Sequence, residues 1–225
     1  MSACYLKSTI GKKQMMAVTG LAWCGFVVGH MLGNLLYLVG PEAFNAYGHG
    51  ITSGHLYYAI EAGLLATLLG HIFFAFLVIM ANRAARPVGY AVSPQGKAKT
   101  GATNASRTMA YSGTLILVFI ITHLLTFRFG PVYEGTAGGV AVRDLSRLMV
   151  EIFSSPGQVL WYAIAMAVLA GHLSHALWSS LQTLGFIPGG KEPAVRKASY
   201  AFGVLVSLGF VVNPLYIFFM QRGGQ

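Results

Sequence analysis

The sequence predicts an all-α integral membrane protein with one domain, residues 1–225, built as a bundle of five transmembrane helices. Hydrophobic residues make up 55% of the chain and charged residues only 9%, whereas soluble domains carry about 25% charged residues. Five stretches almost free of charge are each long enough to cross a bilayer, which takes about 20 apolar residues. The lysines and arginines gather in short clusters between these stretches. Composition, span length and charge placement therefore indicate the same fold class.

The predicted spans follow one another with connections of uneven length. In chain order they cover residues 15–39, 56–82, 108–127, 157–185 and 198–220. The fourth begins after Ser155 and Pro156, because proline is tolerated in a first helical turn, where its missing N–H needs no partner. Pro214 lies inside the fifth span and predicts a kink there.

The connection between the third and fourth spans has a pattern of its own. Its apolar residues recur at helical spacing, with charged residues on the opposite face. This pattern predicts a short amphipathic helix over residues 140–153, which lies in the interface or covers the bundle.

Loop charge predicts the orientation. Eleven of the fifteen lysines and arginines fall in the N-terminal segment and in the second-to-third and fourth-to-fifth connections, which share one side of the bundle. By the positive-inside rule that side is cytoplasmic, so the N-terminus lies inside and the C-terminus outside. The net charge of +9 is then a topology signal rather than a nucleic-acid-binding surface. We expect a multi-pass protein of the bacterial inner (cytoplasmic) membrane.

Four of the seven histidines lie within four different spans. They are His30, His71, His123 and His172. Polar groups at membrane depth are rare and often functional, although any single one could be a hydrogen-bonded packing residue. Six-coordinate haem iron in a helical bundle takes two axial nitrogens from facing helices, so four histidines supply two haems. No Cys-x-x-Cys-His motif occurs, so we expect b-type haems without thioether links.

Glycines precede three of these four histidines. Gly29, Gly70 and Gly171 stand directly before candidate ligands, where a small residue lets a flat macrocycle approach. The alternative is close helix packing through the row Gly25, Gly29 and Gly33.

His30 and His123 lie toward the outer ends of their spans, whereas His71 and His172 lie near mid-span. This predicts an outer haem on the first pair and an inner haem on the second, stacked as an electron path across the membrane.

The spaced set of motifs resembles a known family. The set comprises Gly29-His30-Met31, Gly40-Pro41-Glu42 leading to Tyr47-Gly48-His49, Ala59-Ile60-Glu61 ahead of His71, Thr122-His123-Leu124, Ser154-Ser155-Pro156 and Gly171-His172-Leu173-Ser174-His175. Over essentially the whole chain it is similar to the single-chain, two-haem cytochrome b anchor of succinate dehydrogenase and quinol:fumarate reductase.

The resemblance implies the wider assembly. It implies that the four histidines are axial ligands, paired as depth pairs them, and that His175 and His49 bind no haem. A flavoprotein subunit and an iron–sulfur subunit would dock on the cytoplasmic face. Electrons would pass between the iron–sulfur subunit, the inner haem, the outer haem and menaquinone near the outer surface. Some relatives carry a glutamate just before the fourth-span ligand for a compensating proton path, but Ala170 and Gly171 stand here.

Glu61 is the only acidic residue within a predicted span. It lies about 15 Å outward of His71, at a rise of about 1.5 Å per residue. A buried carboxyl with a raised pKa suits quinone-linked proton transfer, which makes Glu61 the candidate catalytic residue. The alternative is a structural hydrogen bond to another helix or to a ligand histidine.

Two other classes of function stay open. One is the two-haem anchor of another dehydrogenase, such as hydrogenase or formate dehydrogenase. The other is a haem-free transporter or assembly factor whose histidines bind protons or metals. The chain has no nucleotide-binding glycine loop and no cysteine cluster, so flavin and iron–sulfur chemistry would belong to other subunits. The direction of succinate–fumarate turnover stays open too.

Overall fold

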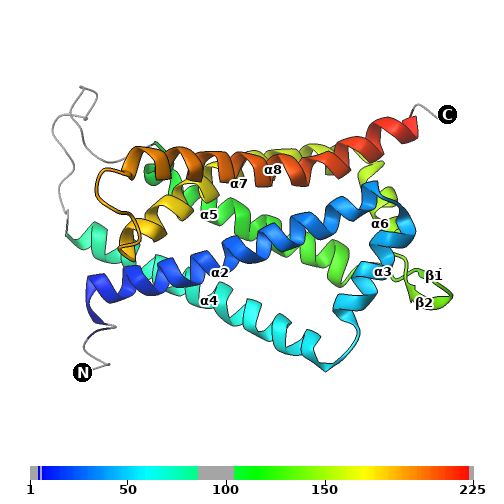
Figure 1. The fold of residues 1–225 in the computed structure, drawn as a ribbon, viewed down its shortest axis with the longest axis horizontal. Coiled ribbons are helices and arrows are strands. Elements are labelled where there is room, and N and C mark those ends of the chain that lie inside the picture. Colours follow the sequence, from blue (N-terminus) through cyan, green and yellow to red (C-terminus); the bar gives the residue numbers. More distant parts are fainter. Residues whose placement is uncertain (1–4, 6, 86–103, 223–225) are drawn as a thin grey trace.

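Five long apolar helices lie side by side along the long axis of the molecule, with the two termini at opposite ends (Figure 1). The computed structural model describes residues 5, 7–85 and 104–222, and the five are those of this part of the chain that could cross a membrane. They are α2 (Thr9–Leu35), α4 (His55–Ala84), α5 (Asn104–His123), α7 (Pro156–Thr183) and α8 (Glu192–Arg222). This confirms the predicted all-α membrane bundle.

The helices extend beyond the apolar segments that predict them. α2 begins at Thr9 because the Ser8 side chain accepts a hydrogen bond from the backbone N–H of Gly11 (3.0 Å), which caps the helix. α7 starts at Pro156, after Ser155, as the sequence predicts. α8 begins at Glu192, because its polar first turns continue the helix outside the apolar stretch, and it runs on through Pro214.

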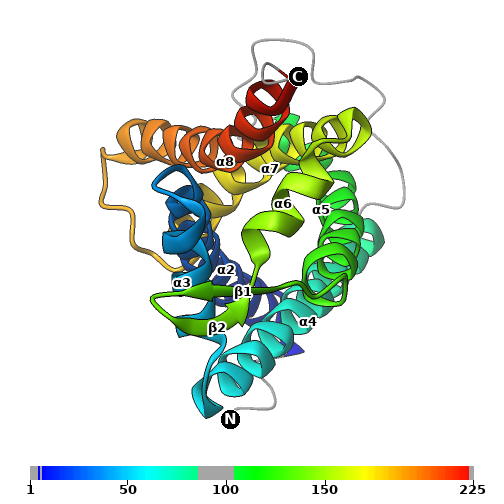
Figure 2. The ribbon, with the colours of Figure 1, turned by 90° about the vertical axis from the view of Figure 1, so that its right-hand side faces the viewer.

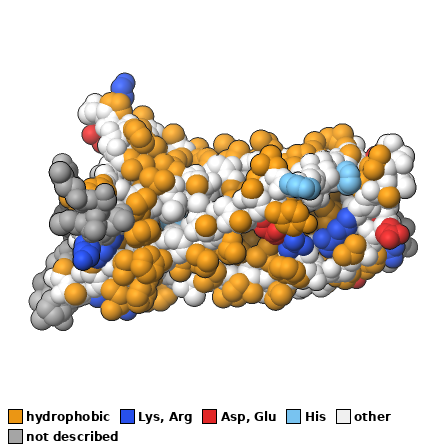
Figure 3. All heavy atoms as spheres, turned by 90° about the horizontal axis from the view of Figure 1, so that it is seen from below, with side chains coloured by type: hydrophobic (Ala, Val, Ile, Leu, Met, Phe, Trp, Pro, Cys, Tyr) orange, Lys and Arg blue, Asp and Glu red, His pale blue; other side chains and the backbone are white. Residues whose placement is uncertain are grey.

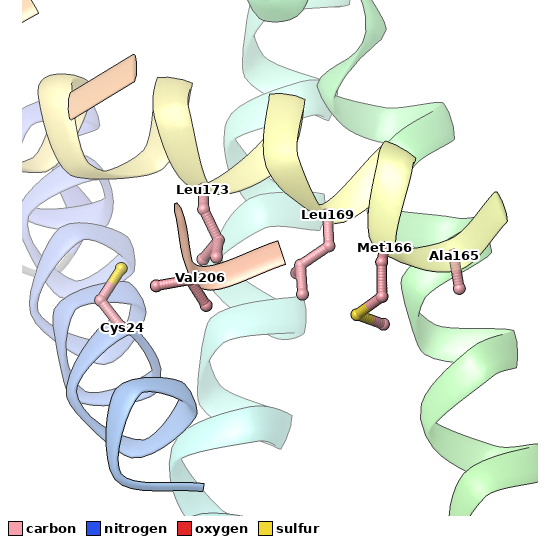
Figure 4. Packing of buried hydrophobic residues seen from close by; sticks show 6 residues of the cluster. All are labelled: Cys24, Ala165, Met166, Leu169, Leu173 and Val206. Atoms are coloured by element: carbon pink, nitrogen blue, oxygen red, sulfur yellow. The ribbon is translucent and has the colours of Figure 1, made fainter. Parts of the chain in front are cut away.

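The interior of the bundle lies between α2, α7 and α8. Its buried side chains are Cys24, Ala165, Met166, Leu169, Leu173 and Val206 (Figure 4). α7 and α8 pack tightly at Gly203, where an added Cβ would overlap the carbonyl oxygen of Ala170. Glycine is therefore required at this crossing, in the way that small residues bring membrane helices together.

α4 packs mainly along α2 and presents apolar side chains outward. The exposed ones include Leu65, Leu69, Phe73 and Phe76. Hydrophobic side chains dominate the face of the molecule shown in Figure 3. Such a surface is suited to contact with lipid rather than water.

A small cap crosses one end of the bundle (Figure 2). It consists of α3 (Pro41–Thr52), the hairpin β1 (Glu134–Ala137) with β2 (Val140–Arg143), and α6 (Leu145–Phe153). We call the end of the bundle that carries it the cap end; the C-terminus of the chain lies at the same end (Figure 1). Of the two placements expected for the amphipathic helix, the structure shows the one that covers the bundle.

The expected helix over residues 140–153 is wrong in its first part. Gly138 and Gly139 have φ of 57° and 78°, values that suit a two-residue hairpin turn, so residues 140–143 pair with β1 instead. Asp144 then starts α6, its carboxylate accepting from the backbone N–H of Arg147 (3.0 Å). α3 lies in the connection between the first and second predicted spans, for which no helix was expected. Pro41 and Glu42 in its first turn are helix-start signals.

Candidate haem-binding centre

His30 of α2 and His123, the last residue of α5, face each other near the cap end. Their ring centroids are 5.8 Å apart, with an interplanar angle of 82°. Metal–imidazole bonds are about 2 Å long, so two imidazoles on opposite sides of one metal ion have centroids roughly 6 Å apart. The observed separation fits a single iron between the two rings. Phe26 and Phe210 lie against His30, so the pair sits in an aromatic environment.

His71 of α4 and His172 of α7, the second predicted pair, interact electrostatically. His71 lies against the first half of α2, where its Nδ1 is 3.1 Å from the carbonyl oxygen of Met16. Met16 and His30 are roughly 21 Å apart along α2 at 1.5 Å per residue. The two pairs therefore lie at different depths, with the His30–His123 pair nearer the cap.

Three of the four rings hold a protein partner at Nδ1. Besides the His71 contact, His172 Nδ1 lies 3.0 Å from Ser112 Oγ, and His123 Nδ1 lies 3.1 Å from the Tyr162 hydroxyl. Histidines that bind a metal through Nε2 characteristically donate their other N–H to such an acceptor, which fixes the tautomer and the ring orientation. The donor set of this chain fits haem iron on these grounds.

The glycines beside the histidines divide into two kinds. An added Cβ at Gly33 would overlap the Tyr47 ring of α3, so close packing explains that residue. An added Cβ at Gly29 or Gly171 would meet no atom within 4 Å. Packing between helices of this chain therefore does not require glycine at these two positions, whereas a flat macrocycle beside the ligands does favour it.

A hollow of about 350 Å³ opens beside His172, between α5 and α7. Ser112 and Leu115 line it from α5, and Gly171 lines it from α7. Ligand sites of this kind are largely apolar with a few placed polar groups. Its lining therefore suits one edge of a haem.

Glu61 does not have the buried environment that the sequence led us to expect. Its side chain is 42% exposed and pairs with Arg128, whose Nε lies 2.8 Å from Oε1. The Tyr57 hydroxyl also donates to Oε1 (3.2 Å). The expected burial is wrong because Glu61 lies on a stretch of α4 whose large side chains are exposed, Tyr58, Ile60 and Leu65 among them. What the structure shows is the alternative, a bond to another transmembrane segment.

Arg128 belongs to a feature that the sequence pattern did not reveal. Residues Leu124–Arg128 form η2, a π-helical turn directly after His123, and such turns are frequent at functional sites. The turn places the arginine opposite Glu61. Because the pairing spans distant parts of the chain, only the position of Arg128 at the end of a span could have drawn attention to it.

The remaining histidines are His49, His55 and His175. His55 is exposed at the start of α4, and His49 lies in α3. His175 is one turn beyond His172 and interacts electrostatically with Arg196. Among the described residues there is no group of three or more His, Cys, Asp or Glu side chains that could hold a metal ion.

The loop cations expected to face the cytoplasm are only partly described. Arg86, Lys97 and Lys99 lie outside the described residues. Lys12 and Arg83, which are described, lie at the end of the bundle opposite the cap.

Comparisons with known proteins give one similarity. The chain is 24% identical over 165 residues to the succinate dehydrogenase cytochrome b558 subunit of Bacillus subtilis (strain 168), covering 71% of this chain and 72% of that protein. No family model matches the chain, and no solved structure matches it. The similarity supports the family resemblance carried by the histidine motifs.

Proposed function

We propose that the chain is the membrane-anchor subunit of a succinate dehydrogenase or quinol:fumarate reductase complex, a cytochrome b that holds two b-type haems. The similarity to a succinate dehydrogenase cytochrome b subunit supports the anchor role. The observation that carries the proposal is the opposition of His30 and His123 at 5.8 Å. His71 and His172, deeper in the bundle, are proposed as the second pair. Four imidazoles on four spans fit two bis-histidine sites.

Each haem iron, when bound, carries one electron between its ferric and ferrous states. The residues of the chain hold and orient the group. His30 and His123 would bind the cap-end haem, and His71 and His172 the other. Contacts at Nδ1 keep Nε2 of His71, His123 and His172 free to coordinate. The apolar spans exclude water from both sites.

The two sites give electrons a path along the bundle. With the N-terminus cytoplasmic, His71 and His172 would hold a haem nearer the face that binds an iron–sulfur subunit and its flavoprotein partner. His30 and His123 would hold one nearer the outer surface, where it would supply one-electron exchange with menaquinone. These partners would dock in a bacterial cytoplasmic membrane at the end opposite the cap, where the described cations Lys12 and Arg83 lie.

Glu61 remains our candidate for proton transfer to or from the quinone, in a revised setting. Its carboxylate, held by Arg128 and Tyr57, lies near the cap end, on the same side as His30 and His123. A carboxylate oxygen there can take a proton from a quinol hydroxyl or return one to a reduced quinone. Arg128 keeps that oxygen oriented between turnovers.

The test is the composition of the purified complex. A pyridine haemochrome assay is expected to give about two haems per chain, together with a covalent-flavin band and an iron–sulfur protein. Fewer than two haems in the intact protein refutes the two-haem proposal. Copurification with a nickel or molybdenum protein instead assigns the chain to another dehydrogenase, and complete absence of haem favours a transporter or assembly factor.

A further inference from the structure

The phenol of Tyr162 contacts the ring of a candidate haem ligand, His123. Tyr162 lies on α7 with 8% of its surface exposed, and its hydroxyl is 3.1 Å from Nδ1 of His123 on α5. The contact is not local, since it joins two helices. It therefore ties the orientation of the His123 ring to the position of α7.

Aromatic rings hold Tyr162 in place from two sides. Phe119 of α5 meets its ring edge-on at 4.9 Å and 81°, and Phe153 of α6 does so at 4.9 Å and 85°. Phe153 is itself buried, with 3% of its surface exposed. Aromatic rings prefer edge-to-face contacts of this kind, so these contacts stabilise one orientation of the ring. The hydroxyl is thus fixed by the cap as well as by the bundle.

We propose that Tyr162 is a positioning residue that sets the reduction potential of the cap-end haem through His123. This inference rests on the proposed function. If Nε2 of His123 binds iron, Nδ1 carries the proton and donates to the tyrosine oxygen. Such a bond makes the imidazole a more basic ligand, which stabilises ferric iron and lowers the midpoint potential.

The deeper pair has a matching arrangement that supplies an internal comparison. Ser112 of α5 holds Nδ1 of His172 on α7 at 3.0 Å, while Tyr162 of α7 holds the histidine of α5. Each helix therefore supplies the hydroxyl that contacts a histidine of the other helix, one such contact at each depth. Removal of either hydroxyl should affect one haem and leave the other unchanged.

The experiment compares Tyr162→Phe and Ser112→Ala in the intact complex by redox titration and electron paramagnetic resonance. Signals are assigned beforehand with His123→Ala and His172→Ala, each of which should remove one haem. Tyr162→Phe is expected to retain both haems, raise the midpoint of the cap-end haem and shift its resonance. Ser112→Ala should act on the other haem alone. Tyr200→Phe, on an exposed tyrosine of α8, should change the midpoint potential of neither haem.

Tyr162→Phe preserves the ring packing, so a purely structural role predicts no spectroscopic change. Unchanged midpoints and resonances in a two-haem complex overturn the inference, whereas a wild-type complex without haem overturns the proposed function instead. If Tyr162→Phe does not assemble, Phe153→Leu provides the second test. This variant keeps the Tyr162 hydroxyl but removes the aromatic ring that holds Tyr162 in place. It should shift the midpoint potential and the resonance of the cap-end haem alone. An unchanged cap-end signal in that variant also counts against the inference.

Discussion

Arg128 and Glu61 join the π-helical end of the third span to α4, with Arg128 Nε 2.8 Å from Glu61 Oε1. Both side chains are about two-fifths exposed, at 40% and 42%. The position of the pair at the cap end directs attention to the quinone reaction.

We expect Glu61→Gln to retain both haems and to lower quinone-linked turnover at least about a hundredfold, the lower end of the range of about 10²–10⁴ that general acid–base catalysis supplies. Glutamine keeps the shape and the hydrogen bond to Arg128 but cannot take a proton. The measurement is turnover with a menaquinone analogue, together with haem content. Arg128→Gln is the matched control, because it breaks the ion pair and leaves the carboxylate. An equal loss in both variants would assign the effect to pairing, and full activity in Glu61→Gln would refute the proton role.

The ligand set makes a prediction about haem number. Alanine at His30 or His123 should remove the same single haem, and alanine at His71 or His172 should remove the other, because a bis-histidine site needs both nitrogens. Haem content should fall from about two to about one per chain in the pyridine haemochrome assay. His175→Ala should retain both haems, since the proposed sites use one histidine from each of four spans and leave His175 out. Loss of a haem in His175→Ala would reverse the assignment on α7.

The spans could be predicted because they depend on local sequence. Hydropathy locates a span, and the position of a histidine within it gives its depth. Depth predicts the His30–His123 ring pair that the structure shows, whereas the pairing of His71 with His172 stays a prediction. The setting of Glu61 depends on Arg128, 67 residues away, and on a π-helical turn that apolar periodicity does not show. The prediction that Glu61 is buried rested only on its position within its own apolar span.

The cap shows a different limit. Val142 continues the apolar spacing of α6, so periodicity alone extends the helix back to residue 140. The Gly138–Gly139 turn overrides that spacing because its positive φ values suit a hairpin. α3 was missed because it is a short helix beside a long apolar span, although Pro41 marks its start.

The space beside two glycines tests whether haem or helix packing requires them. Leucine at Gly29 or Gly171 meets no protein atom at its Cβ, so we expect the chain to fold while the adjacent haem is lost or displaced. Gly63→Leu, on α4 with equally open surroundings, is the control and should keep both haems. Haem content and the visible spectrum decide the outcome. Normal haem content in both test variants would show that the space faces lipid.

Asp144 connects the parts of the cap. Its carboxylate accepts from Ser146 Oγ (2.6 Å), from Asn45 Nδ2 of α3 (2.8 Å) and from the backbone N–H of Arg147. Partial burial alone would raise the pKa of this carboxyl, but these hydrogen bonds outweigh that effect and hold the pKa below its ordinary value of 3.8. The bonds need the ionised form, so they make the attachment of α6 to α3 dependent on pH.

A carboxyl whose pKa is lowered by folding adds stability above its unfolded pKa and loses it as pH falls through the folded value. We therefore expect the cap to loosen only below pH 3.8, while Asp144→Ala loosens it at neutral pH by about 0.5–2 kcal/mol, the usual cost of a lost N-cap. Asp144→Asn keeps a capping oxygen that does not titrate, so this contribution to the pH dependence should disappear. Hydrogen exchange of α6 amides across this pH range measures the effect. The same pH dependence in wild type and Asp144→Asn would show that another group controls the cap.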